Sequence, residues 1–470
     1  MLDEKQEAAA AANPEVSDLR DADGALRPDL VERAAEAIEA GDGAALQDLV
    51  GEWHESDMGD LIGALDPPLR PKLVELLGEK FDFKALTEVD HAVCLEVLDA
   101  LDPRSVAGRL RELESDDAVS ILEGLPDEKQ RDILERLPHA ERVTLARSLQ
   151  YPEDSAGRRM QTEYIDVRPD ATVGQTIDYL RETPDLPERF YQIFVTDPQH
   201  RLLGAVPLDR LLRAKRPVPM SELMEEELHR VRAADDQEEV ARMFERYDLI
   251  AAPVVDEAER LVGVITVDDV VDVIEQEAEE DIKALGGVHN EELSDPVWTV
   301  ARRRFNWLLV NLATAFLASS VLGLFEGELQ KMVALAVLAP IVASQGGNAA
   351  TQTMTVAVRA LAVRELSRAN AWRIILREVL VGIVNGLAFA VITGLAAFAW
   401  FKVPQLGVVI GLAMICNLIA AALGGILIPL VLDRYGADPA VSSGTFVTTV
   451  TDVVGFFSFL GIATLWFGLR

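Results

Sequence analysis

The last third of this 470-residue chain holds five apolar stretches, each near the length that crosses a lipid bilayer. A membrane-spanning helix needs about 20 apolar residues, because the hydrocarbon core is about 30 Å thick. Backbone polar groups inside a bilayer must be bonded within the segment, so such stretches form helices. The sequence therefore predicts a five-helix α transmembrane domain over residues 301–470. Its spans are residues 305–325, 331–362, 374–401, 406–432 and 444–467.

One carboxylate, Asp452, lies inside the last of these spans. A carboxylate at the bilayer centre costs about 2.5–3.5 kcal/mol on insertion scales, so it usually faces a bundle interior or a wet path. Residues 448–451 next to it include threonine hydroxyls and no basic side chain. We interpret Asp452 as part of an ion pathway. The alternative is a structural ion pair with a base on another helix, for which Arg377 is the candidate.

The second span is longer than one crossing requires, and Gly346 and Gly347 lie in its middle. We expect the helix to break there, since interrupted helices expose backbone carbonyls along transport paths. The alternative is close helix packing through small residues, which Ala349 and Ala350 also suit.

Arginines set the expected orientation. Arg302, Arg303 and Arg304 flank the first span, and further arginines cluster between the second and third spans. The positive-inside rule places both groups, and the N-terminal domains, in the cytosol. Five crossings then put the C-terminus outside, so we expect a multi-pass protein of a bacterial-type inner (plasma) membrane.

The residues before the spans are strongly acidic. Residues 1–301 hold 32 Lys+Arg and 71 Asp+Glu, whereas residues 302–470 hold 12 and 7. This balance argues against nucleic acid as a partner and favours cations. The two cysteines, Cys94 and Cys416, lie in different halves, which excludes a disulfide framework and suits a reducing cytosol. No nucleophile–base pattern or phosphate-binding loop is found, so an enzyme is not expected.

Residues 1–28 are predicted to be a disordered tail, because they are low in aromatic residues and mixed in charge. Residues 29–150 are predicted to form an all-α superhelical N-domain. Segments 60–77, 95–113 and 119–137 each contain an apolar helix, a proline-containing turn and a second apolar helix. Such repetition is typical of helical repeat arrays.

Residues 151–272 contain a duplicated α/β unit. The runs 193–204 and 252–263 match at an offset of 59, each with a strand, an acidic turn and a second strand. This pattern resembles a tandem pair of cystathionine-β-synthase (CBS) domains. Such pairs often bind adenine nucleotides, and the second copy has the usual ribose-contact residues Thr266 and Asp269. The first copy lacks them, which counts against nucleotide binding, and the alternative is that Thr266 and Asp269 cap a helix.

An acidic connecting helix is predicted over residues 273–300, between the CBS pair and the spans. The order of these parts resembles the MgtE family of magnesium transporters. Local matches are residues 318–322, Gly346 to Asn348 and residues 451–455. The resemblance implies a magnesium-selective uptake channel or transporter that is a homodimer, with Asp452 of both protomers facing one path.

The resemblance also implies that carboxylates of the cytosolic half bind regulatory Mg²⁺. High cytosolic Mg²⁺ would bridge these acids and close the path, and low Mg²⁺ would let the acidic domains repel and open it. The matching positions are Asp236, Glu238, Asp248, Asp269, Asp272, Glu277, Glu280 and Asp281, with Asp116 and Asp117 in the N-domain.

Three alternatives remain open at this point. The chain could be a carrier coupled to sodium or protons, a broader transporter of cobalt, nickel or manganese, or a membrane-anchored nucleotide sensor without transport. The oxygen-only surroundings of Asp452 favour a hard ion such as Mg²⁺ over the softer transition metals.

Overall fold

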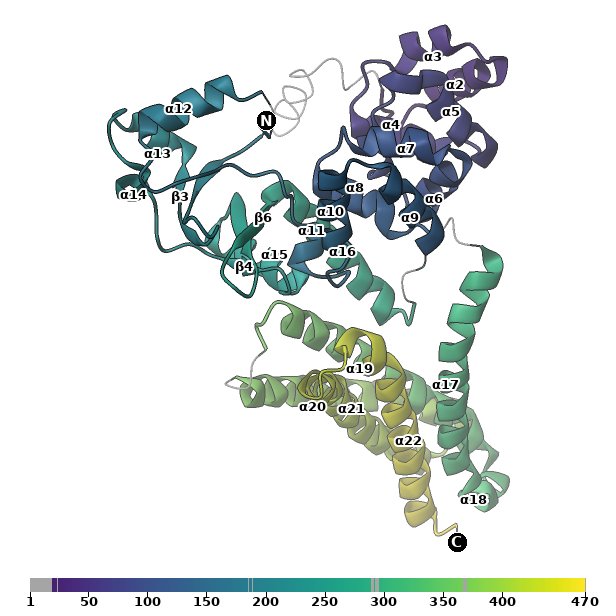
Figure 1. The fold of residues 1–470 in the computed structure, drawn as a ribbon. Coiled ribbons are helices and arrows are strands. Elements are labelled where there is room, and N and C mark those ends of the chain that lie inside the picture. The colour runs from purple at the N-terminus through teal and green to yellow at the C-terminus, as the bar shows by residue number, and fades with distance from the viewer. Residues whose placement is uncertain are drawn as a thin grey trace, which may run out of the picture. The chain divides into compact units, whose positions relative to one another are not determined.

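The computed structural model describes residues 19–22, 24–184, 186–187, 189–288, 291, 296–366 and 370–469. The chain divides into two compact units, of which the first ends at Gln276 and the second begins at Glu277 (Figure 1). Most of the predicted tail, residues 1–18, lies outside the described residues. Beyond it, Arg20 pairs with Asp57 at 2.5 Å and with Asp60 at 2.8 Å, so the segment before the first helix is held to the helical array.

Residues 28–148 form the predicted array of short helices. The helix–turn–helix segments predicted from the sequence are confirmed as α4 with α5, α6 with α7, and α8 with α9. Leucines such as Leu61, Leu98 and Leu122 are fully buried in one shared apolar core. The helices are α2 (Pro28–Ala40), α3 (Gly43–Val50), α4 (Glu55–Ala64), α5 (Arg70–Leu77), α6 (His91–Ala100), α7 (Pro103–Leu110), α8 (Ser115–Glu123), α9 (Asp127–Arg136) and α10 (His139–Ser148), with 3₁₀ turns at Pro67–Leu69, Gly78–Lys80 and Phe83–Leu86.

Two small sheets of the same topology follow, which confirms the duplication. In each sheet the first strand pairs parallel with the second, and the second pairs antiparallel with the third. Val195 opposes Gly204 in one copy and Val254 opposes Gly263 in the other, at the predicted offset of 59. The elements are α11 (Ala156–Arg159), β1 (Asp166–Val167), α12 (Val173–Glu182), β2 (Gln192–Thr196), β3 (Leu202–Pro207), α13 (Leu208–Arg213), α14 (Met220–Leu223), β4 (Val231–Arg232), α15 (Gln237–Tyr247), β5 (Ala251–Val255) and β6 (Leu261–Thr266).

The acidic helix that leaves the second copy, α16, spans Val267–Leu285. It begins directly after β6, six residues before the predicted start at residue 273. It ends at Gly286 and Gly287, of which Gly287 has a left-handed φ of 71°. The helix is therefore not continuous to residue 300, because two glycines in sequence favour a turn over a further helical turn.

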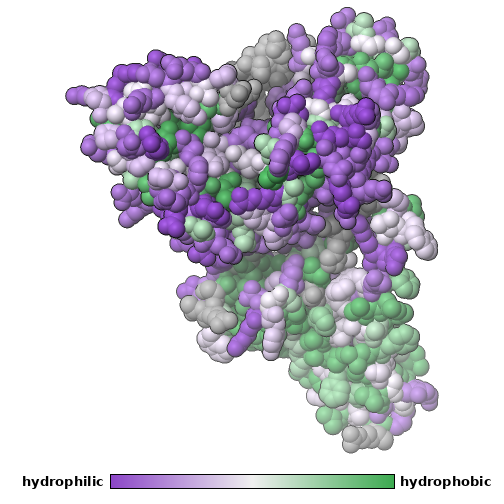
Figure 2. Space-filling model, viewed as in Figure 1, coloured by the Kyte–Doolittle hydropathy of each residue, from purple (hydrophilic) through white to green (hydrophobic). Residues whose placement is uncertain are grey.

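Among the described residues of the second unit, five helices are long and apolar enough to cross a membrane, as predicted. They are α17 (Val297–Gly323), α19 (Val333–Ala362), α20 (Ala371–Phe401), α21 (Pro404–Arg434) and α22 (Pro439–Phe467), with the short α18 (Glu326–Lys331) between the first two. Figure 2 shows apolar residues over much of the outer face of these helices, in contrast to the polar face of the first unit. Such an outer face suits contact with lipid.

Helix α21 packs against α19, α20 and α22, and α17 packs against α22. Small residues bring these helices close together. A Cβ at Gly394 of α20 would lie 2.8 Å from the carbonyl oxygen of Gly407 on α21, so the two backbones touch there. Close backbone approach is the usual basis of helix association in membranes.

The structure contradicts the predicted break in the second span. Helix α19 is continuous through Gly346 and Gly347. Gly346 lies against the carboxamide of Asn417 on α21, and a Cβ at Gly347 would lie 3.5 Å from Thr448 on α22. The small-residue alternative is the correct one, because these glycines admit side chains of neighbouring helices and leave the helical hydrogen bonds intact.

The two glycines of α4 give opposite predictions. A Cβ at Gly59 would lie 2.7 Å from Cβ of Glu88, whereas a Cβ at Gly63 meets nothing within 4 Å. We expect Gly59→Ala to destabilise α4 by about 1–3 kcal/mol through overpacking. Gly63→Ala should stabilise it by about 0.5–1 kcal/mol through helix propensity. Hydrogen exchange of the α4 amides in the full-length protein measures both changes, and shifts of the same sign would contradict this packing.

Candidate functional site

Acidic side chains gather where α8 begins. One carboxylate oxygen each from Glu114, Asp116 and Asp117 lies within 4.8 Å of the others. Asp116 and Asp117 occupy the first turn of α8, where the positive end of the helix dipole favours anions. This is the spacing at which several carboxylates can share one cation.

Asp269 of α16 joins this group from the second CBS-like copy. Its carboxyl group lies close enough to that of Asp116 for the two to shift each other's pKa. Oδ1 of Asp116 is buried and has no hydrogen-bond partner among the described residues. The predicted candidates Asp116, Asp117 and Asp269, which lie far apart in the sequence, are therefore brought together. Asp272, one turn after Asp269, and Glu88 lie close enough to act on these charges. We call Glu88, Glu114, Asp116, Asp117, Asp269 and Asp272 the acidic cluster.

Burial and mutual repulsion raise the pKa values of the cluster. Burial, followed by the charge of Asp269, raises the pKa of Asp116 well above its ordinary value. Burial raises the pKa of Asp117 to about 6, although Lys84 opposes the shift. Burial and the nearby Glu88 raise the pKa of Asp272. These directions mean that ionised carboxylates are held here at a free-energy cost, which a bound cation would remove.

Lys84 is the nearby base, and its Nζ lies 3.4 Å from Oδ2 of Asp117 and 4.0 Å from Oε2 of Glu114. Glu163 holds the start of α8, since its Oε2 accepts from the amide of Ser115 at 3.2 Å and from the hydroxyl at 2.8 Å. Sequence reasoning missed Lys84, Glu88, Glu114 and Glu163. Of these, only Glu114 could have been found, from its place beside Asp116.

The candidates around α15 are not brought together within one chain. Asp236 caps the start of α15 and accepts from the amide of Glu238 at 2.9 Å. Glu238 pairs with Arg242. Asp248 ends the helix in the left-handed conformation, with φ of 52°. At about 1.5 Å per residue the two ends of α15 are too far apart to share an ion within the protomer.

The remaining sensor candidates, Glu277, Glu280 and Asp281, lie on the C-terminal half of α16, in the second unit. Glu280 is exposed, and Glu277 and Asp281 are partly buried. They follow Asp269 along the helix by two to three turns.

The geometry of Thr266 and Asp269 favours the helix-cap interpretation over the nucleotide contact. The amide and hydroxyl of Thr266 donate to Oδ2 of Asp269 at 3.2 Å and 2.8 Å. Because α16 begins at Val267, Asp269 is the third residue of the helix, and its carboxylate accepts from the amide of the residue before the helix, as in one half of a capping box. Asp269 is thus already engaged by Thr266 and lies close to Asp116.

In the second unit, Asp452 lies in the middle of α22 and is partly buried. It makes no hydrogen bond or ion pair with any residue that the structure describes. Arg377, the base considered for it, is exposed on α20, a helix that packs against α21. The structural ion pair is therefore absent from the described part of the chain.

Three threonines lie on α22 in the four residues before Asp452. Thr448 donates to the carbonyl of Gly444 at 2.5 Å, Thr449 donates to that of Thr445 at 2.6 Å, and the buried Thr451 donates to that of Thr448 at 2.9 Å. Because each hydroxyl hydrogen is bonded to the backbone, the oxygen lone pairs remain free to accept. Acceptors beside a carboxylate suit a hydrated cation.

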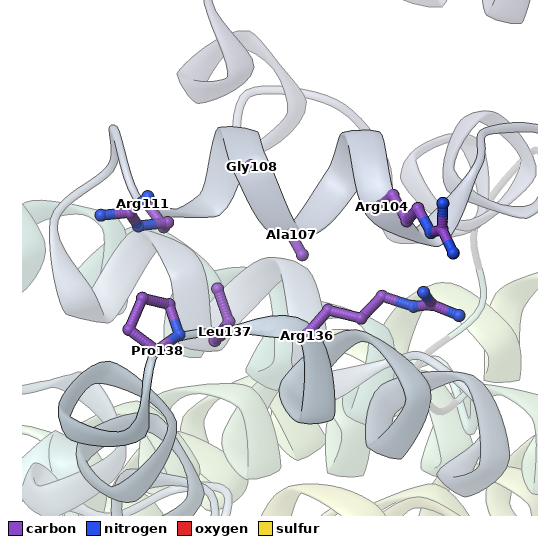
Figure 3. Close-up of a pocket in the computed structure, with 7 residues that line it drawn as sticks. All are labelled: Arg104, Ala107, Gly108, Arg111, Arg136, Leu137 and Pro138. Atoms are coloured by element: carbon purple, nitrogen blue, oxygen red, sulfur yellow. The ribbon is translucent and has the colours of Figure 1, made fainter.

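A separate groove of about 550 Å³ lies on the helical array between α7 and the end of α9. It is lined by Arg104, Ala107, Gly108, Arg111, Arg136, Leu137 and Pro138. Figure 3 shows the guanidinium groups of Arg104 and Arg136 at the same end of the groove. With three arginines and no carboxylate in its lining, this groove does not suit a cation.

Family models match both halves of the chain. The model described as MgtE, a divalent cation transporter, matches residues 339–462. The MgtE intracellular N domain matches residues 53–154, and a CBS domain matches residues 220–276.

Similar proteins extend over nearly the whole chain. The magnesium transporter MgtE of Thermus thermophilus is 35% identical over 454 residues, which cover 92% of this chain and 97% of the relative. That of Bacillus subtilis is 28% identical over 417 residues, covering 88% and 92%. A solved structure of the cytosolic domain of the Mg²⁺ channel MgtE in complex with ATP shares 34% identity, covers 52% of this chain and 99% of its own, and has a TM-score of 0.48.

The acidic cluster predicts an unusual pH dependence in metal-free solution. Asp117 has a pKa of about 6 in the folded protein against an ordinary 3.8, so the folded state binds more protons between these values. The stabilising contribution of its protonation is full below pH 3.8 and is lost as the pH rises to about 6. It amounts to at most about 3 kcal/mol.

Denaturant unfolding of the first unit measures this, by comparing wild type with Asp117→Asn from pH 4 to pH 7. The difference in free energy of unfolding should grow with pH in favour of the variant. Asp48→Asn, at an exposed acid, is the control and should follow the wild type. A pH-independent difference would contradict the burial of Asp117.

Proposed function

Because this chain belongs to the MgtE family of magnesium transporters, we propose that it is a homodimeric, magnesium-selective uptake channel or transporter in which Asp452 lines the ion path. The observation that carries this proposal is a carboxylate in the middle of a membrane helix with no partner in the described part of the chain. We further propose that Mg²⁺ bound by the acidic cluster closes the path by negative feedback.

The surroundings of Asp452 support a path between two copies. The side chain is only partly covered by its own protomer, and lipid contact for a carboxylate costs about 2.5–3.5 kcal/mol. A second copy over this face would remove the carboxylate from lipid and place two Asp452 side chains on one path.

The chemistry of the path suits Mg²⁺ that keeps its water. Mg²⁺ dehydrates reluctantly, and carboxylate and hydroxyl oxygens can hold its hydration shell through hydrogen bonds. Conduction requires binding weak enough for the ion to leave. One carboxylate per protomer near the exposed Thr448 hydroxyl meets this requirement better than a closed cage of direct ligands.

The regulatory proposal is supported by the charge of the acidic cluster. Moving a gate from 1:99 to 99:1 requires about 5.5 kcal/mol of differential binding, which several weak sites can supply together. Asp236, Glu238, Asp248, Glu277, Glu280 and Asp281 are proposed as further Mg²⁺ ligands. Since α15 separates Asp236 from Asp248, their shared ions would lie between different parts of the dimer.

The membrane orientation follows from the helix ends. The arginines at the start of α17, at the end of α19 and at the start of α20 mark the cytosolic side, with the N-terminal domains. We propose that the C-terminus, after α22, lies outside. The hydrogen bond from Thr266 to Asp269 counts against Asp269 as a ribose contact, so we do not include adenine nucleotide in the proposed mechanism.

We expect Asp452→Asn to reduce Mg²⁺ flux into proteoliposomes at least about tenfold, because the neutral amide no longer attracts the hydrated cation. Asp433→Asn, at an exposed acid in the last turn of α21, is the control and should retain flux. Full flux through Asp452→Asn would remove Asp452 from the path. Mg²⁺ flux that depends on a sodium or proton gradient would show a coupled carrier. Equal flux of Co²⁺, Ni²⁺ or Mn²⁺ would show a transporter of broader ion selectivity.

Asp116→Asn combined with Asp117→Asn is expected to raise the cytosolic Mg²⁺ concentration that half-inhibits flux about tenfold, within the usual range of coupling energies. The matched control neutralises two exposed acids of the same domain, Asp48→Asn with Glu52→Gln. Flux is measured with Mg²⁺ varied on the face of the soluble domains. Unchanged half-inhibition would exclude the acidic cluster as the sensor.

A further inference from the structure

Asn417 is a fully buried polar side chain in the middle of α21. Its Nδ2 donates to the carbonyl oxygen of Val342 on α19 at 2.7 Å. Its Oδ1 is buried and finds no hydrogen-bond partner in the described part of the chain. An unpaired polar atom in an apolar interior is costly, so an aliphatic side chain would serve better if filling space were the only role.

Two glycines, one on each neighbouring helix, leave room for this carboxamide. A Cβ at Gly346 of α19 would overlap Nδ2 of Asn417, and a Cβ at Gly455 of α22 would lie 2.8 Å from the same atom. Gly461 of α22 has no such neighbour, since a Cβ there meets nothing within 4 Å. The space at residues 346 and 455 is therefore shaped by Asn417.

Asn417 donates to a carbonyl oxygen of α19, that of Val342, which also accepts a backbone hydrogen bond within the helix. In a continuous helix the amide of Gly346 bonds to the carbonyl of Val342, and Asn417 donates to the same oxygen, which has two lone pairs. This second bond fixes α21 to α19 without breaking the helix. The glycine pair therefore accommodates a contact between helices, and the helix break that we expected there does not occur.

The contact of Asn417 with Gly455 on α22 brings this arrangement close to the proposed ion path. Gly455 follows Asp452 by three residues, less than one helical turn. We propose that Asn417 is a positioning residue that fixes the height and rotation of α22 against α19, and thereby the position of Asp452. This inference rests on the proposed transport function, and Asn417 itself does not touch Asp452.

The first test is Asn417→Leu, which keeps the branched shape of the side chain and removes the hydrogen bond to Val342. We expect the half-saturating Mg²⁺ concentration or the maximal flux to worsen about tenfold, within the range known for residues that act through others. The amount of folded protein and its thermal transition should change little. Gly461→Ala is the control and should match the wild type.

The second test adds a methyl group at residue 346 and then shortens the side chain at residue 417 that it would overlap. Gly346→Ala alone should lose flux, because its Cβ displaces the carboxamide, and Asn417→Ala in the same chain should recover part of it. If Gly346→Ala lost flux through a contact with some other residue, shortening Asn417 would not restore it. Wild-type flux and half-saturation in Asn417→Leu, or a tolerated Gly346→Ala beside Asn417, would overturn the proposal.

A third measurement does not require transport. Spin labels at Val337 on α19 and Phe457 on α22, both exposed, report the distance between the helices in the full-length protein. Asn417→Leu should shift or broaden this distance, and an unchanged distribution would overturn the proposal. If the wild type transports no Mg²⁺ and the distance still shifts in Asn417→Leu, the proposed transport function is wrong. The positioning of α22 by Asn417 is then still supported.

Discussion

Carboxylates held away from water without enough positive charge are the constraint on which both units depend. In the first unit, Glu114, Asp116 and Asp117 gather at the start of α8, and Nζ of Lys84 lies 3.4 Å from Oδ2 of Asp117. Each helix start contributes about half a positive charge. These sources offset only part of the repulsion between the carboxylates. Burial, together with the remaining repulsion, therefore raises the pKa values of Asp116, Asp117 and Asp272. The fold leaves a deficit of positive charge that a divalent cation would fill.

The same deficit occurs in the membrane unit on a smaller scale. Asp452 stands alone, and no base in the described part of α17 to α22 pairs with it. The two places differ in how strongly they should hold a cation. Several carboxylates within 4.8 Å favour an ion that stays, as regulation requires. A single carboxylate beside hydroxyls favours an ion that leaves, as conduction requires.

The parts of the fold that follow from local patterns could be predicted from the sequence. Hydropathy alone located the five spans, and the 59-residue offset located the duplicated sheets, because each signal is contained within one stretch of chain. The role of Gly346 could not be predicted, because the side chain that requires it, Asn417, lies on another helix. Asp116 and Asp269 were both candidates, yet their pairing depends on the packing of α8 against α16. Glu88 and Lys84 carry no local signal.

The position of Asp269 suggests how a cation at the cluster could act on the helix that leads toward the membrane unit. Asp269 accepts from Thr266 at the first turn of α16 and also lies close to Asp116. A cation drawn to the cluster would compete for the same carboxylate oxygens. It would therefore change the electrostatics of the N-terminus of α16 at the point where the helix is capped. Because Glu277, Glu280 and Asp281 lie on the same continuous helix, a change at its first turn alters the element that presents them. If both sets of carboxylates bind cations as proposed, binding at one set would be coupled to binding at the other, and by linkage each set would raise the affinity of the other when both favour the same state.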